Sequence, residues 1–92
     1  MLVELNYTGV KQDDYDSMMP EVEPQLRAAD GFQAHLAARA EGGWRVVEVW
    51  ESQQAAETWL ETMIRPAMER AGGAMPAVTF TPLHNLIIGP VR

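Results

Sequence analysis

Hydrophobic positions recur along this chain with two different periods, one typical of strands and the other of helices. Together they predict four strands and two helices. Residues 1–8 alternate apolar with polar side chains, as a half-buried strand does. Residues 32–40 show the same alternation, and residues 44–50 are rich in the β-branched and aromatic side chains typical of a strand. Gly42-Gly43 between them provides the positive φ that a tight turn needs, so these segments predict an antiparallel hairpin. A last apolar segment, residues 78–88, predicts the fourth strand.

Helical periodicity fills the two intervals that remain. Over residues 13–29 apolar side chains recur at steps of three and four, while Pro20 and Pro24 lack the backbone N–H and obstruct the preceding turn. That segment therefore predicts either one kinked helix or two short ones. A second helix is predicted to begin after Ser52, a residue suited to the N-cap, and to bend or restart at Pro66 before a glycine pair ends it.

The resulting order, β-α-β-β-α-β, predicts a single α+β domain over residues 1–92. It is a ferredoxin-like fold, a four-stranded antiparallel sheet with both helices on one face. The predicted strands nevertheless carry apolar residues on both faces, as in Leu86-Ile87-Ile88. Because exposing a contiguous apolar patch is unfavourable, we expect the uncovered face to pack against a second copy in a C2 homodimer.

Composition and charge exclude several classes of partner. The chain carries thirteen acidic against seven basic side chains, a net charge of −6 at pH 7. An acidic surface repels phosphate, which argues against nucleic acid and anionic membranes. The apolar runs are far shorter than the roughly 20 residues that span a bilayer, so no transmembrane helix is expected. The absence of cysteine removes thiolate chemistry and fits a cytoplasmic location.

One stretch of the chain resembles a known superfamily. It comprises residues 43–52, GWRVVEVWES, and the apolar helix that follows them. The stretch is similar to the dimeric α+β barrel superfamily, and most of all to its antibiotic biosynthesis monooxygenase group, in which a strand ending in Trp-Glu-Ser runs directly into such a helix. The resemblance covers essentially the whole chain in element order. It implies a dimeric α+β barrel, with chemistries that range from cofactor-free oxygenation of aromatic polyketides to isomerisation and haem degradation.

The haem-degrading branch of that group has a pocket that can be compared residue by residue. An Asn of the first strand and a Trp of the second helix line it, and Asn6 and Trp59 occupy those places here. That branch ligates iron with a His further along the helix, where this chain has Glu69. A carboxylate in place of the imidazole removes the usual iron ligand, so haem binding or degradation is the least favoured implication.

The candidate chemistry is expected in a pocket between the sheet and the helices. His35 and His84 are the natural acid–base groups, because imidazole alone has an ordinary pKa near neutrality; each is otherwise a structural residue of its strand. Asn6 is a candidate donor to a phenolate, or else it caps a backbone group. Glu4 or Glu48 would act as the base only if it faced the pocket.

Further residues are expected to bind the substrate, most of them as apolar walls. They are Trp44, Trp50, Trp59, Met63 and Arg39. A structural role explains each equally well, since tryptophan and methionine fill cores and an arginine near a hairpin turn is usually solvated. The His and carboxylate spacings do not match a metal site, and no cofactor is expected.

Two functional hypotheses of different kinds follow from these residues. The first is an enzyme that modifies a small aromatic or polyketide-like metabolite, by cofactor-independent oxygenation or by acid–base chemistry of the cyclase or isomerase kind. The second is a non-catalytic dimer that binds a small apolar or aromatic ligand in the same pocket. The side chains that collect in the pocket decide between them.

Overall fold

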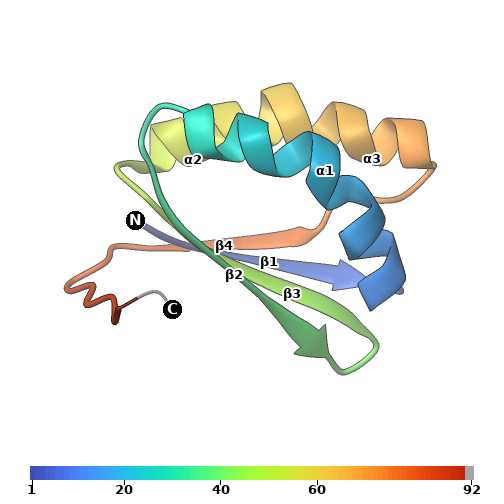
Figure 1. Cartoon of the computed structure of the whole chain (residues 1–92), viewed down its shortest axis with the longest axis horizontal. Helices are drawn as coiled ribbons and strands as arrows, with labels where there is room; N and C mark the ends of the chain where they lie inside the picture. Colours follow the sequence, from blue (N-terminus) through green and yellow to red (C-terminus); the bar gives the residue numbers. More distant parts are fainter. Residues whose placement is uncertain (91–92) are drawn as a thin grey trace.

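The computed structural model describes residues 1–90 and has the β-α-β-β-α-β order (Figure 1). The strands are β1 (Leu2–Thr8), β2 (Phe32–Ala40), β3 (Gly43–Trp50) and β4 (Ala77–Thr81). They pair antiparallel in the order β2-β3-β1-β4. The helices α1 (Gln12–Ala28), α2 (Gln53–Trp59) and α3 (Arg65–Ala71) all lie on one face of this sheet. The ferredoxin-like fold is therefore confirmed.

The first helix, α1, is continuous, although two prolines lie inside it. Pro20 and Pro24 are both exposed, and their spacing of one helical turn places them on the same side. The carbonyl groups that lose a donor lie on this solvent side, where water can bond to them. At the helix start, the Lys11 backbone N–H donates to Asp14 Oδ2 at 2.9 Å. Of the two predicted forms, the structure has the single helix.

The second predicted helix is divided in the way that its proline indicates. Ser52 Oγ accepts a hydrogen bond from the Ala55 N–H at 3.1 Å and so caps α2. A π-helical turn, η1 (Leu60–Ile64), then precedes α3, and Pro66 lies in the first turn of α3. Proline cannot donate to the carbonyl four residues earlier and clashes with it, and the wider π turn accommodates this defect. The helix thus restarts at Pro66, as predicted.

The last strand is shorter than predicted. The prediction of a strand over residues 78–88 is wrong beyond Thr81, because residues 82–90 have no regular secondary structure. Pro82 follows β4 directly and has no N–H with which to continue the hydrogen-bond ladder. Ile87 and Ile88 therefore do not belong to the sheet, and they are 85% and 64% exposed.

The core lies between the helices and the sheet face that they cover. Val3 and Leu5 of β1 are fully buried there, together with Trp50 of β3. On the opposite face Leu36 is 59% exposed and pairs across the hairpin with Val47. Within residues 1–90 no helix is both long and apolar enough to cross a membrane.

The close approach of β1 to the hairpin turn gives a prediction about stability. A Cβ at Gly43 would lie 1.8 Å from the Tyr7 carbonyl oxygen, whereas a Cβ at Gly42 would meet nothing within 4 Å. Gly43→Ala should therefore force two strands apart and lower the free energy of unfolding by about 2 kcal/mol or more. Gly42→Ala, strained only by its positive φ, should cost about 1 kcal/mol. Urea unfolding followed by tryptophan fluorescence measures both, and equal effects would contradict the prediction.

Candidate active site

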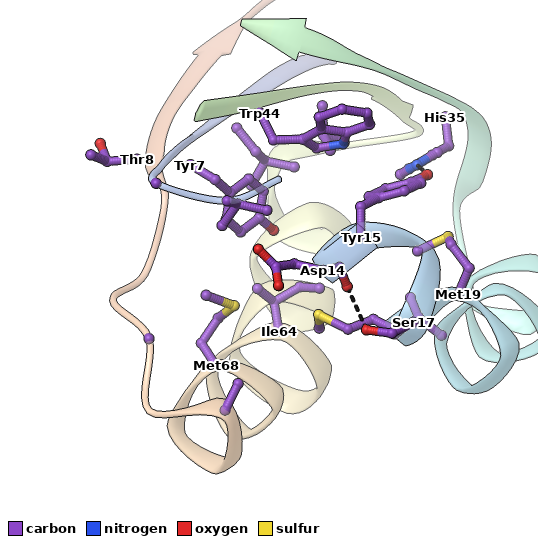
Figure 2. A pocket seen from close by; sticks show the side chains of 18 of the residues that line it. Tyr7, Thr8, Asp14, Tyr15, Ser17, Met19, His35, Trp44, Ile64 and Met68 are labelled. Atoms are coloured by element: carbon purple, nitrogen blue, oxygen red, sulfur yellow. Dashed lines mark hydrogen bonds between the residues drawn. The ribbon is translucent and has the colours of Figure 1, made fainter. Parts of the chain in front are cut away.

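A cavity of about 370 Å³ lies between the sheet and the helices. Residues of β1, β2 and β3 form one wall, and residues of α1 and of the α2–η1–α3 stretch form the other (Figure 2). The volume falls within the range of about 300–1,000 Å³ that is usual for small-molecule sites. Most lining side chains are apolar. The aromatic and titratable ones are Tyr7, Asp14, Tyr15, His35, Trp44, Glu48 and Trp59.

Four side chains form one hydrogen-bonded chain beside this cavity. The Tyr15 hydroxyl lies 2.6 Å from His35 Nε2, and His35 Nδ1 lies 2.7 Å from Glu48 Oε2. The second carboxylate oxygen, Oε1, accepts from the Trp50 indole N–H at 3.0 Å. Glu48 is only 3% exposed. A carboxylate so deeply buried needs such partners, and this one has a donor on each oxygen.

The Glu48 carboxylate sets the direction in which hydrogen bonds are donated along this series of side chains. Because a carboxylate only accepts hydrogen bonds, Glu48 keeps the imidazole proton of His35 on Nδ1. Nε2 is then the acceptor for the Tyr15 O–H. Figure 2 shows the Tyr15 ring beside those of His35 and Trp44 at the cavity. His35 thus presents its unprotonated nitrogen, Nε2, to the Tyr15 hydroxyl, and its Nδ1–H is directed to the Glu48 carboxylate.

The hairpin register brings His35 and Glu48 together. Ala40 pairs with Gly43 across the two-residue turn, and the same register carries back to the pair His35 and Glu48. Residues directly opposite in an antiparallel pair project to the same face. This face is the one that the helices cover, and Tyr15 reaches it from the start of α1.

A β-bulge adjusts the other end of β2. The register shifts between Phe32 and Ala34, so Phe32 pairs with Trp50 and shares its face. The two rings meet edge to face, with centroids 5.6 Å apart. Strict alternation would have placed Phe32 and His35 on opposite faces, and the bulge brings both under the helices.

Burial and the Glu48 charge both act on the tyrosine hydroxyls. Burial raises the pKa of Tyr7 far above its ordinary value, and the negative charge of Glu48 raises it further. The pKa of Tyr15 is raised by the same two causes in the same order, with additions from Asp16 and Glu23. Both hydroxyls therefore remain protonated at neutral pH. Tyr15 can pass its proton to His35 only if it receives another from a bound molecule.

Two tryptophans wall the cavity and are nearly inaccessible. Trp44 is 8% and Trp59 5% exposed, and both line the cavity. The Trp44 ring packs beside Tyr15, with centroids 5.2 Å apart and planes inclined by 36°. The indole N–H groups of both tryptophans are buried and have no hydrogen-bond partner among the described residues.

The structure brings part of the predicted set of site residues together. His35, Trp44 and Trp59 line the cavity. Trp50 lies behind it and reaches it only through its hydrogen bond to Glu48. Met63 does not line this cavity; it lines a separate hollow that it shares with Trp50 and Trp59.

Three predicted residues lie elsewhere. Asn6 is exposed on the opposite sheet face, because its strand neighbours Leu5 and Tyr7 point into the cavity. His84 is exposed in the segment after β4. Arg39 is exposed and lines a different hollow at the hairpin end.

The carboxylates that the sequence singled out also lie in different places. Glu4 forms an ion pair with Arg45, with 2.8 Å between Oε1 and Nη2, and does not line the cavity. Glu69, the residue at the haem-ligand place, is exposed on α3. Within residues 1–90 no group of three or more His, Asp and Glu side chains is placed to hold a metal ion. Glu48 is the carboxylate that joins the histidine.

Sequence reasoning missed the position of Tyr15 at the cavity, where its hydroxyl meets His35. It placed this residue only in the apolar stripe of a helix, and nothing in the stripe marks a hydroxyl that meets a histidine. The pairing of His35 with Glu48 had a readable signal. A two-residue turn at Glu41-Gly42 fixes the register of the hairpin, and counting back from the turn places the two residues opposite each other.

Titration of the tyrosines reports on this site directly, because Tyr7 and Tyr15 are the two tyrosines of the sequence. Their raised pKa values mean that the folded protein holds both protons above the ordinary pKa of about 10. Tyrosinate absorbance should therefore develop at higher pH in the native protein than in urea. Stability should be intact below about pH 10 and decline above it, where the unfolded chain ionises first. Tyr7→Phe and Tyr15→Phe assign the two steps, and coincident native and unfolded titrations would contradict this expectation.

Comparisons with known proteins agree with this fold. The sequence matches the family described as antibiotic biosynthesis monooxygenase over residues 4–71. A crystal structure of a candidate antibiotic biosynthesis monooxygenase from Deinococcus radiodurans has the same fold, with a TM-score of 0.63 and 16% identity over 97% of this chain and 100% of the other. A search of curated proteins finds no significant match. The family match covers most of the chain, and the protein therefore belongs to the antibiotic biosynthesis monooxygenase family.

Proposed function

We propose that this protein is an enzyme that removes a proton from a small aromatic molecule bound in the cavity, with His35 as the base. The observation that carries the proposal is the chain Tyr15–His35–Glu48. It joins an imidazole, a buried counter-charge and a hydroxyl at an aromatic-walled cavity. A purely structural histidine would not need to lie beside a cavity of ligand size.

Tyr15 is the contact between the base and the substrate. Its hydroxyl already donates to His35 Nε2, so a substrate proton reaches the imidazole in two linked transfers. The substrate proton moves to the Tyr15 oxygen as the Tyr15 proton moves to Nε2. The raised pKa of Tyr15 disfavours a free tyrosinate, so both transfers occur together. Glu48 then holds the imidazolium until the proton returns.

Oxygenation of an activated methylene follows from that step if molecular oxygen is the co-reactant. A C–H bond breaks, its proton passes to His35, and the carbanion gives an electron pair to O₂ as a C–O bond forms. The peroxide takes the proton back. Loss of the second proton from the same carbon breaks the O–O bond, which leaves a carbonyl and releases water. The carbon loses four electrons and O₂ gains four.

Proton transfer without oxygen uses the same residues. Cyclisation or isomerisation of an aromatic ketone needs a proton removed at one atom and returned at another, which a single His–Glu pair can do. The family match favours oxygenation as the first reaction to test. Binding without catalysis is the alternative that remains if the protein moves no proton of any molecule bound in the cavity.

The test compares the two histidines of the chain. Oxygen uptake and product formation are measured on a panel of polycyclic phenols and aromatic ketones, without added flavin, metal or nicotinamide. His35→Gln, which keeps a donor near Glu48, should lower kcat by about 10²–10⁴ because the base is lost. His84→Gln is the matched control; it lies outside the cavity and should leave kcat unchanged within about twofold.

The Tyr15→Phe variant distinguishes proton transfer through the Tyr15 hydroxyl from direct proton transfer to His35. It keeps the ring and removes the hydroxyl, so kcat should fall while the Michaelis constant changes little. Unchanged kcat in His35→Gln would remove this residue from the mechanism. If the unaltered protein turns over no member of the panel, the ligand-binding hypothesis replaces the enzyme.

We also propose that the protein works as a homodimer through the open face of its sheet. No helix among residues 1–90 covers that face, and Leu36 stands exposed on it beside Val47. The small side chains Ala34 and Ala38 flank Leu36 on the same strand face, which permits close packing of a second sheet. Such packing would remove apolar surface from water.

Sedimentation velocity measures this assembly. The protein should sediment as a dimer at micromolar concentration, and Leu36→Glu should shift it toward monomer because a charge is then buried in the interface. Gln53→Glu adds the same charge on the exposed start of α2 and should leave the dimer intact. A monomer for the unaltered protein would contradict the proposal.

A further inference from the structure

The floor of the cavity is nearly closed to solvent. Leu5, Val46 and Glu48 line it, and none of them is more than 3% exposed. Because water barely reaches these side chains, a larger aromatic molecule contacts them only when part of a wall moves. Exposed residues at the cavity include Asp14 and Ser17 on the first turns of α1, which Figure 2 shows beside it.

The two helical walls differ in how firmly they are anchored. On the α2–η1–α3 side, buried side chains recur in every turn over residues 60–68. The buried residues of α1 are Val22 and Leu26, both in its second half. Residues 12–19 have side chains that are only partly buried or exposed. Segments with few buried contacts open at the lowest cost, so the first half of α1 is the wall that moves most easily.

Two prolines weaken the connection between the halves of α1. Pro20 has no N–H to donate to the Asp16 carbonyl, and Pro24 leaves the Pro20 carbonyl without a donor. A residue that precedes proline favours extended backbone, so Met19 is helical against its preference. Unwinding residues 12–19 therefore breaks fewer hydrogen bonds than in an uninterrupted helix. The sequence pattern permits one long helix or a shorter one, and both forms have a use here.

One hydrogen bond holds this half-helix against the sheet. The Tyr15 hydroxyl lies 2.6 Å from His35 Nε2, and within residues 1–90 no other side-chain hydrogen bond joins residues 12–19 to a strand. Just before the helix, the Gly9 N–H donates to the Gly42 carbonyl at 2.8 Å and ties the chain to the hairpin turn. The segment is thus fixed at both ends and fastened near its middle.

From these observations we infer that residues 12–19 form a lid, which unwinds to admit a molecule to the cavity and rewinds over it, with the Tyr15–His35 hydrogen bond as its latch. Any molecule that enters the cavity uses this lid, whether or not it is then altered. For the proposed function one consequence follows, and it rests on that function: the path from substrate through Tyr15 to His35 is complete only when the lid is closed.

Thiol labelling measures the opening without a substrate. The sequence has no cysteine, so one introduced thiol reports on one position. Val46→Cys places it on the cavity floor, whereas Val3→Cys places it at a fully buried position that does not line the cavity. Each native protein is labelled with iodoacetamide, and its rate is divided by the rate in urea. Val46→Cys should react at least about tenfold faster than Val3→Cys, because the lid opens without global unfolding.

Three further changes, made in the Val46→Cys protein, test the latch and the weak point. Tyr15→Phe removes the latch and should speed labelling about three- to tenfold. Pro20→Ala restores the missing N–H and should slow labelling about tenfold or more. Tyr7→Phe removes a hydroxyl from the β1 side of the same cavity and should leave the rate unchanged within about twofold.

The same changes in the Val3→Cys protein distinguish a lid from a general loss of stability. Equal labelling of Val46→Cys and Val3→Cys, or an effect of Tyr15→Phe that is the same at both positions, overturns the inference. Labelling of Val46→Cys that Pro20→Ala does not slow also overturns it. None of these outcomes touches the role of His35, which only turnover tests.

Hydrogen exchange of the unaltered protein gives the same answer if a cysteine variant does not fold. The amides of residues 16–19 should exchange together, at least about tenfold faster than those of residues 25–28. Equal protection in the two halves of α1 would show that no lid opens separately.

Discussion

Moving the carboxylate of Glu48 from water into the interior costs several kcal/mol unless donors replace the water that it loses. The fold provides two, one on each oxygen, from His35 and Trp50. These partners are not interchangeable. Trp50 can only donate, and it fixes the carboxylate in place, whereas His35 can change its protonation. The same burial therefore orients the imidazole and makes its second nitrogen the basic one. A site of this kind needs no separate device to choose the tautomer.

The charge that orients the histidine also controls its surroundings. Burial raises the pKa values of Tyr7 and Tyr15, and this charge raises them further, so both hydroxyls stay protonated at neutral pH. The cavity is lined by two carboxylates, Asp14 and Glu48, and by no lysine or arginine. A single buried carboxylate thus acts on His35, on both tyrosine hydroxyls and on the net charge of the cavity lining. The apolar walls from Trp44 and Trp59 strengthen these effects, because charges act over longer range where water is excluded.

The fold could be predicted from the sequence because its signals are local. Alternation, turn glycines and the Ser52 cap each act within a few residues, and together they give the order of elements. The prediction failed where one residue outweighed a favourable pattern, since Pro82 ends β4 although apolar residues continue. The site could be predicted only in part. His35, Trp44 and Trp59 are rare residue types that attract notice, but Tyr15 meets His35 through helix packing, which no local pattern encodes.

The sequence also left the faces of the strands ambiguous. Asn6 and Tyr7 are neighbours, and a shift of one position decides which of them enters the cavity. Burial of Val3 and Leu5 settles this choice, and it depends on the whole core. The histidines posed the same problem: the hairpin register places His35 opposite Glu48, whereas His84 follows the end of β4 and is exposed.

The antiparallel register of the hairpin has a consequence for how related chains can differ. His35 and Glu48 are separated by 13 positions, and their opposition depends on the two strand arms having matched lengths around the turn. A single deletion within either arm would rotate one partner to the open face and leave a buried charge without its imidazole. Length changes between α3 and β4, or after Thr81, touch no such pair. Insertions and deletions should therefore accumulate in those loops, while the hairpin tolerates substitution but not a change in its residue count.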